Sequence, residues 1–234
     1  SFDLWMPDTG TYYAWADPRK VVPHLQEKRL RAGRSKNSPF SEFNPRVLCD
    51  PKTLPCLRPR IAFRDVSRAT DSRTVRAALV PPEVLLANQG PYLLRPRGDV
   101  RDEAYLVGVL SSLPLDWYAR RFVETHVSFF VFNPFPVPRP PAEHPLRRRA
   151  VELAGRLASP DKRFAAWAKE VGVTCGPVAP GEKEDMIHEI DAVVAHLYGL
   201  TEKHLVHIFE TFHEGWNYEE RLRATLKHFR KLNS

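Results

Sequence analysis

The sequence predicts an α+β fold, in which a loop-rich part with a mixed β-sheet precedes a small bundle of four or five helices. Three observations lead to this expectation. Short apolar runs bounded by turn residues lie between residues 60 and 94, apolar residues recur at helical spacing after residue 145, and 22 of the 234 residues are Pro. Because Pro ends helices and cannot pair inside a sheet, so many prolines indicate irregular backbone between short elements.

The first 60 residues contain eight prolines, and we expect mainly loops and short strands there. One helix is predicted over Val21–Arg31, where apolar residues share a face and several good helix formers follow one another. Gly33 would end this helix. The aromatic residues Tyr12, Tyr13 and Trp15 fall in a predicted strand or turn.

Most of the predicted strands lie between residues 60 and 94. Basic and apolar residues alternate over 60–66, which is typical of a half-buried strand. Apolar or β-prone runs bounded by turn signals predict further strands. These additional strands cover 74–80, 84–87, 92–94 and 129–132. The sequence Asn88-Gln89-Gly90 would form the turn between two of them.

Helical spacing appears in two regions of the sequence. Residues 102–122 read as two buried helices divided by Pro114. An extended Pro-rich segment, 136–141, follows later, and we place a domain boundary there, between residues 1–140 and 141–234. The predicted helices of the second domain cover 146–158, 161–171, 182–198, 201–212 and 218–232. Thr201 and Asn217 are the expected N-caps of the last two.

The basic residues are concentrated in the first part of the chain. The net charge of +7 (35 Lys+Arg against 28 Asp+Glu) belongs to residues 1–140, whereas residues 141–234 carry no net charge. Residues 19–76 hold 15 basic and 5 acidic residues, and Arg outnumbers Lys 25 to 10 in the whole chain. Arg pairs bidentately with phosphates and guanine edges, so this composition favours a nucleic-acid partner slightly over a solvated basic surface.

No pattern of metal or nucleophile chemistry is present. Cys49 and Cys56 are seven positions apart without a second pair, and with Cys175 they are interpreted as reduced thiols. His204 and His207 lie one helical turn apart and are interpreted as surface residues. There is no Walker loop, no GxGxxG, no GxSxG and no acid-x-Lys triplet of a nuclease on a strand. We expect no catalytic residue and no bound metal in this chain.

The run Asn133-Pro134-Phe135-Pro136 has a partial likeness to the Asn/Asp-Pro-Pro-aromatic loop with which amino-methyltransferases hold a flipped adenine. Its third residue is Phe rather than Pro, and no Gly-rich S-adenosylmethionine loop precedes it. We therefore interpret this run as a turn that ends a strand.

Three stretches together resemble one family. Residues 58–74, RPRIAFRDVSRATDSRT, resemble a segment of the target-recognition region of large bacterial adenine-specific DNA methyltransferases, which include single-chain type II restriction–modification enzymes and phage-defence methylases. Residues 106–138, LVGVLSSLPLDWYARRFVETHVSFFVFNPFPVP, are similar to the helix, aromatic run and Pro-rich ending of that region, which is shared with Taq-type methyltransferases. Residues 190–212 resemble, more weakly, the helical tail of these enzymes.

The resemblance implies that residues 1–140 form a DNA target-recognition domain and that 141–234 form a helical C-terminal domain. The catalytic loop and the cofactor loop of the family are missing from this sequence. The resemblance therefore implies a chain without activity or cofactor of its own, whose parent is an adenine-specific methyltransferase that binds S-adenosylmethionine in a separate catalytic domain and is also a candidate restriction endonuclease. We expect the partners to be double-stranded DNA and that methyltransferase domain. The chain begins at Ser1 rather than Met, which fits this expectation of a fragment.

The candidate DNA-binding residues lie in two groups. The first group belongs to the irregular part of the sequence, where base-reading residues are expected, and comprises Lys28, Arg29, Arg31, Arg34, Lys36 and Asn37. The second group belongs to the family-like motif and comprises Arg60, Arg64, Arg68, Arg73 and Arg76. Arg side chains reach phosphates for positioning and guanine for specificity. The alternatives are a solvated loop for the first group, and internal salt bridges from Arg64 to Asp65 or Asp71 for the second.

A different class of function also fits the sequence. The neutral helical part would then dock on a partner subunit of a defence complex, and the basic part would be incidental. No leader or membrane-spanning segment is recognised, so we expect a cytoplasmic location without membrane partners.

Overall fold

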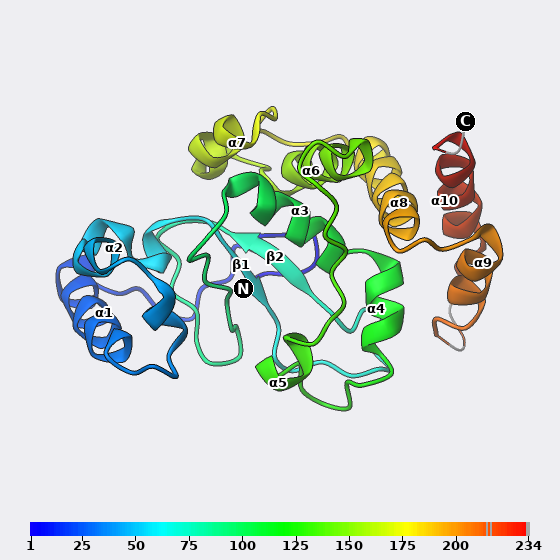
Figure 1. Ribbon diagram of the computed structural model, residues 1–234. Helices are drawn as coiled ribbons and strands as arrows, with labels where there is room; N and C mark the ends of the chain where they lie inside the picture. Colours follow the sequence, from blue (N-terminus) through cyan, green and yellow to red (C-terminus); the bar gives the residue numbers. More distant parts are fainter. Residues whose placement is uncertain (214, 216, 233–234) are drawn as a thin grey trace.

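The computed structural model describes residues 1–213, 215 and 217–232, which form a helix-rich α+β fold (Figure 1). Strands β1 (Arg60–Phe63) and β2 (Ala77–Val80) form an antiparallel pair. The α-helices of the described residues are α1 (Pro18–Gly33), α2 (Pro45–Cys49), α3 (Val100–Leu110), α4 (Leu113–Ala119), α5 (Phe129–Phe132), α6 (Pro145–Ala158), α7 (Ala165–Val171), α8 (Pro180–Leu197), α9 (Glu202–Glu210) and α10 (Glu219–Lys231). The expected α+β class is confirmed at this level, although the sheet is two-stranded and antiparallel rather than mixed.

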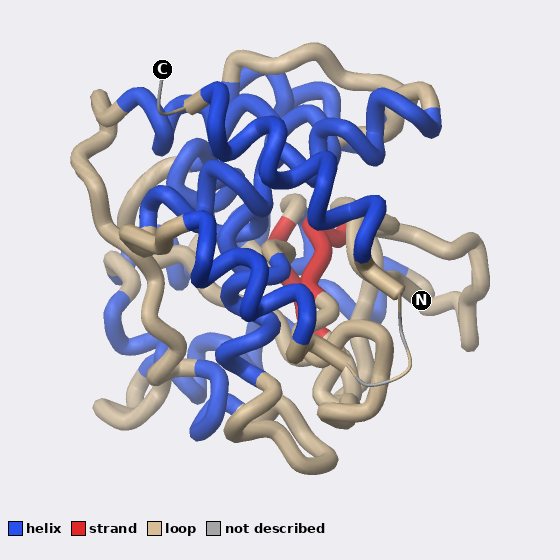
Figure 2. The backbone as a smooth tube through the Cα atoms, turned by 90° about the vertical axis from the view of Figure 1, so that its right-hand side faces the viewer, coloured by secondary structure: helices blue, strands red, loops and turns tan. Residues whose placement is uncertain are grey.

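Strand β1 is buried along its whole length, so the expectation of a half-buried strand over 60–66 is wrong. It pairs with β2 in a register that places Arg60 opposite Val80 and Phe63 opposite Ala77. Its other edge contacts the segment 91–93, because Phe63 N donates to Pro91 O (3.0 Å) and Leu93 N to Ile61 O (2.8 Å). The view from the side shows the two strands inside the molecule, with helices above them (Figure 2).

The strand expected over 74–80 is present as β2, whereas the strands expected over 84–87 and 92–94 do not form. Within 84–94, only Tyr92 makes a β-bridge, to Ala62, and residues 84–87 have no ladder. The turn predicted between them is present, since Gly90 N donates to Ala87 O (2.9 Å). The segment is held as extended chain beside β1 rather than as a strand pair of its own.

Five of the eight prolines in the first 60 residues begin helices, and the short strands expected there are absent from the described residues. Five prolines open α1, α2 and three 3₁₀ helices (Pro39–Glu42, Pro51–Thr53 and Pro55–Leu57). Four of them follow a side chain that caps the helix, namely Asp17, Ser38, Asn44 and Asp50. Pro is favoured at the first helical position because it has no N–H to leave unpaired there.

The aromatic run Phe129–Phe132 forms the one-turn helix α5, so the strand expected there is wrong. Residues three positions apart share a face of a helix. Phe129 and Phe132 therefore both contact Phe63 of β1, at centroid distances of 5.5 Å (edge to face) and 4.2 Å (stacked). A strand would send these two rings to opposite faces. The turn interpretation of 133–136 agrees with the structure, since Phe135 N donates to Phe132 O (3.1 Å).

Helix α3 is the link between the sheet and the helices that follow. Its buried side chains belong to one hydrophobic cluster with β1, β2, α6, α7 and α8, which therefore includes residues on both sides of position 140. Gly108 allows α3 and α6 to approach closely, because a Cβ atom there would lie 2.9 Å from Cβ of Ala154. Pro114 is the second residue of α4, and the pattern is divided into two helices near it as expected.

The five expected helices after residue 141 are present in the described residues, the second of them as a 3₁₀ turn (Lys162–Phe164) that leads into α7. Thr201 caps α9 as predicted. The N-cap of α10 is Tyr218 rather than the predicted Asn217, which lies one residue earlier and accepts a hydrogen bond from Glu219 N (2.9 Å). A second hydrophobic cluster joins α4, α8, α9 and α10. No helix among the described residues has both the length and the apolar character needed to cross a bilayer.

Candidate nucleic-acid interface

The candidate residues of the Arg-rich motif point mainly into the protein. Arg60 is 4% exposed; its Nη2 donates to Val84 O (2.7 Å), and its guanidinium lies 5.0 Å from the centre of the Tyr92 ring. Burial lowers its pKa. Arg60 therefore holds the extended segment 84–92 against β1 and presents no nitrogen for a phosphate.

Arg73 is also buried, and it is bound to the buried carboxylate of Asp116. Its Nε donates to Asp116 Oδ2 (2.6 Å), and its Nη2 donates to the carbonyl oxygens of Ser111 (2.8 Å) and Ser112 (3.1 Å). Asp116 also accepts hydrogen bonds from Thr74 N (3.0 Å) and Val75 N (2.7 Å). The motif thus fixes the β1–β2 connection to the junction of α3 and α4.

Arg64 and Arg76 are half-buried and form internal contacts. Arg64 Nε and Nη2 donate to Phe2 O (3.0 and 2.9 Å), and both side chains lie near Asp3, at 3.5 and 3.8 Å. Arg76 Nη2 is also 3.7 Å from Asp71. Arg64 therefore does form an internal ion pair, as one interpretation expected, but its partner is Asp3 rather than Asp65 or Asp71.

In contrast to the Arg-rich motif, the candidate residues of the irregular part of the sequence are mostly exposed. Four basic side chains and one amide are exposed and form no side-chain hydrogen bond or ion pair with the described residues. They are Lys28, Arg31, Arg34, Lys36 and Asn37. Arg68 of the motif is exposed in the same way, and only its backbone N donates, to Asp71 (3.1 Å). These six residues are the accessible part of the candidate interface.

The basic side chains of α1 share a face of the helix. Lys20, His24, Lys28 and Arg31 follow at intervals of three or four residues, which places them side by side on its exposed surface. Between residues 18 and 58 the chain has ten basic and three acidic residues. In Figure 1, α1 and α2 lie together at one side of the molecule, away from α9 and α10. We call residues 18–58 the basic lobe.

Helices α1 and α2 of the basic lobe are joined mainly by polar contacts, and the buried apolar residues of the lobe, Leu54 and Cys56, lie after them. Arg29 is the buried residue of α1, and α2 has none. The guanidinium of Arg29 donates to Asp50 O (2.7 Å) and to Thr53 Oγ1 (3.0 Å), and Gln26 Nε2 donates to Leu48 O (2.8 Å). Burial lowers the pKa of Arg29. Arg29, named in the sequence with the free basic residues, is therefore a structural residue of the lobe.

An aromatic groove of about 1170 Å³ lies beside the start of the chain. Its lining includes the aromatic residues Tyr12, Tyr13 and Trp15 and residues of the segment 83–90, together with Phe2 and Arg64. Tyr13 is fully exposed and Trp15 is 88% exposed. This segment forms no strand, in contrast to one of the sequence interpretations.

Tyr12 is fixed in the groove wall by a chain of charged groups. Its hydroxyl donates to Asp8 Oδ2 (2.5 Å), which also accepts from Arg163 Nη1 (2.5 Å), and Arg163 binds Asp161 as well (2.8 Å). Burial opposes ionisation of Asp8, but the hydrogen bonds from Arg163 and Tyr12 outweigh it and lower the pKa of Asp8 to about 2.

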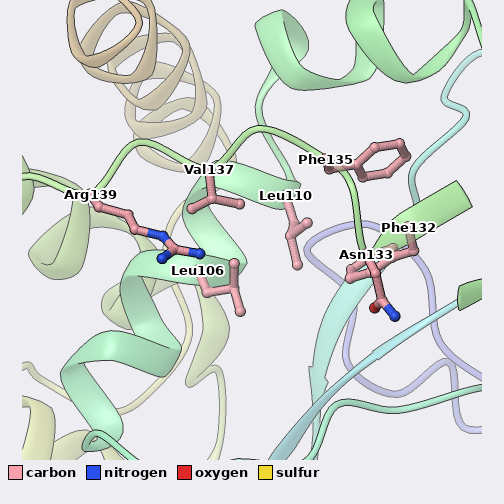
Figure 3. A pocket seen from close by; sticks show the side chains of 7 residues that line it. All are labelled: Leu106, Leu110, Phe132, Asn133, Phe135, Val137 and Arg139. Carbon is pink, nitrogen blue, oxygen red and sulfur yellow. The ribbon is translucent and has the colours of Figure 1, made fainter. Parts of the chain in front are cut away.

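A smaller pocket of about 280 Å³ lies beside the turn at Asn133. Leu106, Leu110 and Val137 lie between its two polar ends, Asn133 and Arg139 (Figure 3). Neither polar side chain has a hydrogen bond to the described residues. Its size is just below the usual range of ligand pockets, and its lining suits a small, largely apolar group.

The described residues contain no group of three or more His, Cys, Asp or Glu placed to hold a metal ion. Cys49, Cys56 and Cys175 are free thiols. His204 and His207, one helical turn apart on α9, contact other parts of the protein. His204 Nδ1 accepts a hydrogen bond from Thr201 N (3.1 Å), and His207 packs edge-on against Trp117.

Sequence reasoning missed the buried carboxylates that fix the Arg-rich motif and the start of α4. Asp116 and Asp191 have no exposed surface, and each accepts hydrogen bonds from a buried or half-buried Arg and from backbone N–H groups. One signal in the sequence could have indicated that they are buried and paired: both lie inside apolar helical patterns, where a buried acidic residue needs a partner. The partners, Arg73 and Arg221, could not be inferred from spacing, because they lie 43 and 30 positions away.

The comparisons with known proteins give no match: no family model, no curated protein and no solved structure is significantly similar to the chain.

Replacing Asp116 by Ala should lower the free energy of unfolding by about 3–5 kcal/mol, because Arg73 would keep a buried charge without its partner. Urea unfolding followed by circular dichroism measures this effect. Asp65→Ala is the control: Asp65 is half-buried with one side-chain contact, His126 at 3.2 Å, and should cost less than about 1 kcal/mol. A loss below 1 kcal/mol for Asp116→Ala would contradict the assigned role.

Asp8 should make the protein acid-sensitive. The pKa of Asp8 is about 2 in the folded state, against 3.8 for an ordinary Asp side chain. Its contribution to the free energy of unfolding is therefore present above about pH 4 and is lost as the pH falls toward 2. Because Arg163 is more than a third exposed, we expect a contribution on the order of 1 kcal/mol. The stability of Asp8→Asn should therefore depend less on pH between about 4 and 2 than that of the unchanged protein. Parallel curves in that range would exclude this role of Asp8.

Proposed function

We propose that this chain is the DNA target-recognition part of an adenine-specific DNA methyltransferase of a restriction–modification or phage-defence system. The observation that carries the DNA-binding part is the basic lobe, whose exposed face has basic side chains without protein partners. The structural arginines of this protein have protein partners: Arg73 binds Asp116, whereas Arg29 and Arg60 bind backbone carbonyls. Lys28, Arg31, Arg34 and Lys36 have no such partner among the described residues, so they are free to neutralise phosphates.

The division of labour between the two groups of Arg residues supports the proposal. Arg60, Arg64, Arg73 and Arg76 hold the sheet, its connection and the N-terminal segment together. The surface residues of α1 and α2 lie over polar contacts such as those of Gln26 and Arg29, so they can change without disturbing an apolar core. A fixed frame that carries a variable surface suits recognition of different DNA sequences by related proteins.

In this proposal the basic lobe contacts duplex DNA, with phosphate contacts that position the protein and a few side chains that read bases. Asn37 and Arg68 are exposed and bear groups that pair with adenine and guanine edges, respectively. Flipping and methylation of the adenine belong to a catalytic domain outside this chain, which would use S-adenosylmethionine. Whether the parent also cleaves DNA would depend on that part of the protein.

The proposal predicts salt-dependent binding to duplex DNA through the basic lobe. Each phosphate contact contributes about 0.9 to the slope of log K against log salt. Replacing Lys28, Arg31, Arg34 and Lys36 by Gln should therefore reduce that slope by up to about 3–4 and weaken binding strongly at low salt. Fluorescence anisotropy with a labelled duplex, at several salt concentrations, measures both quantities.

A matched control removes the same charge elsewhere. Arg148, Lys169, Lys203 and Lys227 are exposed on the helices after residue 141 and form no side-chain ion pair with the described residues. Replacing these four by Gln should leave the slope almost unchanged. If the unchanged chain does not bind a duplex even at low salt, the DNA proposal fails, and a protein-docking module becomes the better explanation. Equal losses in both variants would contradict the role of the basic lobe.

A further inference from the structure

We propose that the aromatic groove binds unpaired nucleobases of a DNA strand by stacking on Trp15 and Tyr13. This inference rests on the DNA-binding part of the proposed function and adds a second, distinct contact to it. The duplex would be held by the basic lobe, and bases outside the double helix would be held by the groove.

The first support is the exposure of the two rings. Tyr13 is fully exposed and Trp15 is 88% exposed, although large aromatic side chains contribute most to stability when they are buried. Neither hydroxyl nor indole nitrogen of these residues has a hydrogen bond to the described residues. Their flat faces are therefore available, and every nucleobase offers a flat face to stack on them.

The second support is that the groove wall is built in advance. Tyr12 packs against Trp15 with ring centres 5.2 Å apart. Its hydroxyl is anchored through Asp8 to Arg163. The half-buried side chains of Val84 and Leu86 pack with the buried ring of Phe2. A rigid wall loses little conformational entropy when a ligand binds.

The third support is electrostatic, and it distinguishes a nucleic acid from a neutral peptide. Aromatic grooves also bind Pro-rich peptides, which need no positive charge. Here the segment that carries the rings leads directly into α1, whose N-terminal part exposes Lys20 and His24 in line with Lys28 and Arg31. Arg64 and the exposed Glu83 both line the groove, and Arg64 is bound to Phe2 O and lies near Asp3, so the excess positive charge is that of α1. A strand whose bases stack in the groove could therefore place its phosphates along the basic face of α1.

The test measures binding of the 234-residue chain to a labelled oligothymidylate of about 12 nucleotides and, separately, to a labelled duplex. Trp15→Ala and Tyr13→Ala should each weaken single-strand binding by roughly 5- to 150-fold, the effect of losing one stacked base. Both side chains are exposed, so both variants should fold. Trp15→Phe should restore most of the affinity, because it keeps an aromatic face.

Phe130→Ala is the control, since Phe130 is 90% exposed but does not line the groove. Oligothymidylate should also quench tryptophan fluorescence in the unchanged chain and not in Trp15→Phe. If the duplex binds normally but the single strand neither binds nor responds to Trp15→Ala, the groove inference fails and the proposed function stands. If the single strand binds through Trp15 and the duplex does not bind, the proposed function fails instead. Binding of a Pro-rich peptide in place of the oligonucleotide would assign the groove to a protein partner and overturn the inference.

Discussion

The carboxylate of Asp116 accepts hydrogen bonds from Arg73, Thr74 and Val75 without any exposed surface, and most of the arrangement follows from this contact. In the low dielectric of the interior such bonds are strong, and an unpaired partner is costly. The connection that enters β2 therefore cannot leave α4 without leaving a charge buried and unpaired. Asp191, equally buried, accepts from Leu113 N and from Arg221, so the start of α4 is also fixed to α8 and α10.

This frame explains why the Arg-rich motif and the basic lobe differ so much. Arg60 and Arg73 are buried inside this frame, where Arg60 binds Val84 O and Arg73 binds Asp116, so neither is accessible to a ligand. The basic lobe lies outside the hydrophobic clusters and is held together internally by polar contacts of Gln26 and Arg29. Its basic face is therefore accessible. The aromatic groove lies next to the start of α1, so two surfaces suited to the same polyanion adjoin each other.

Local signals in the sequence were informative wherever one element decided its own structure. Helical periodicity located the helices after residue 141, and Thr201 was recognised as a cap because its hydroxyl needs only the backbone three positions away. The prolines of the first 60 residues were misread, although each of four follows a capping side chain, because Pro breaks helices and begins them with equal ease. The run Phe129–Phe132 was misread because contacts with the ring of Phe63, which is at least 66 positions earlier in the sequence, overrode its β-propensity.

By itself the sequence determined the α+β class, the order of most helices and the concentration of basic charge before residue 76, since these depend on composition and on spacing within one element. Only the tertiary structure decided which basic residues are accessible. Lys28 and Arg29 are neighbours in the sequence, yet one is exposed and the other is buried against Asp50 and Thr53. The physical reason is that Lys and Arg side chains are long and can either extend into solvent or bind a partner far away in the sequence. The position of that partner is set only when the chain folds.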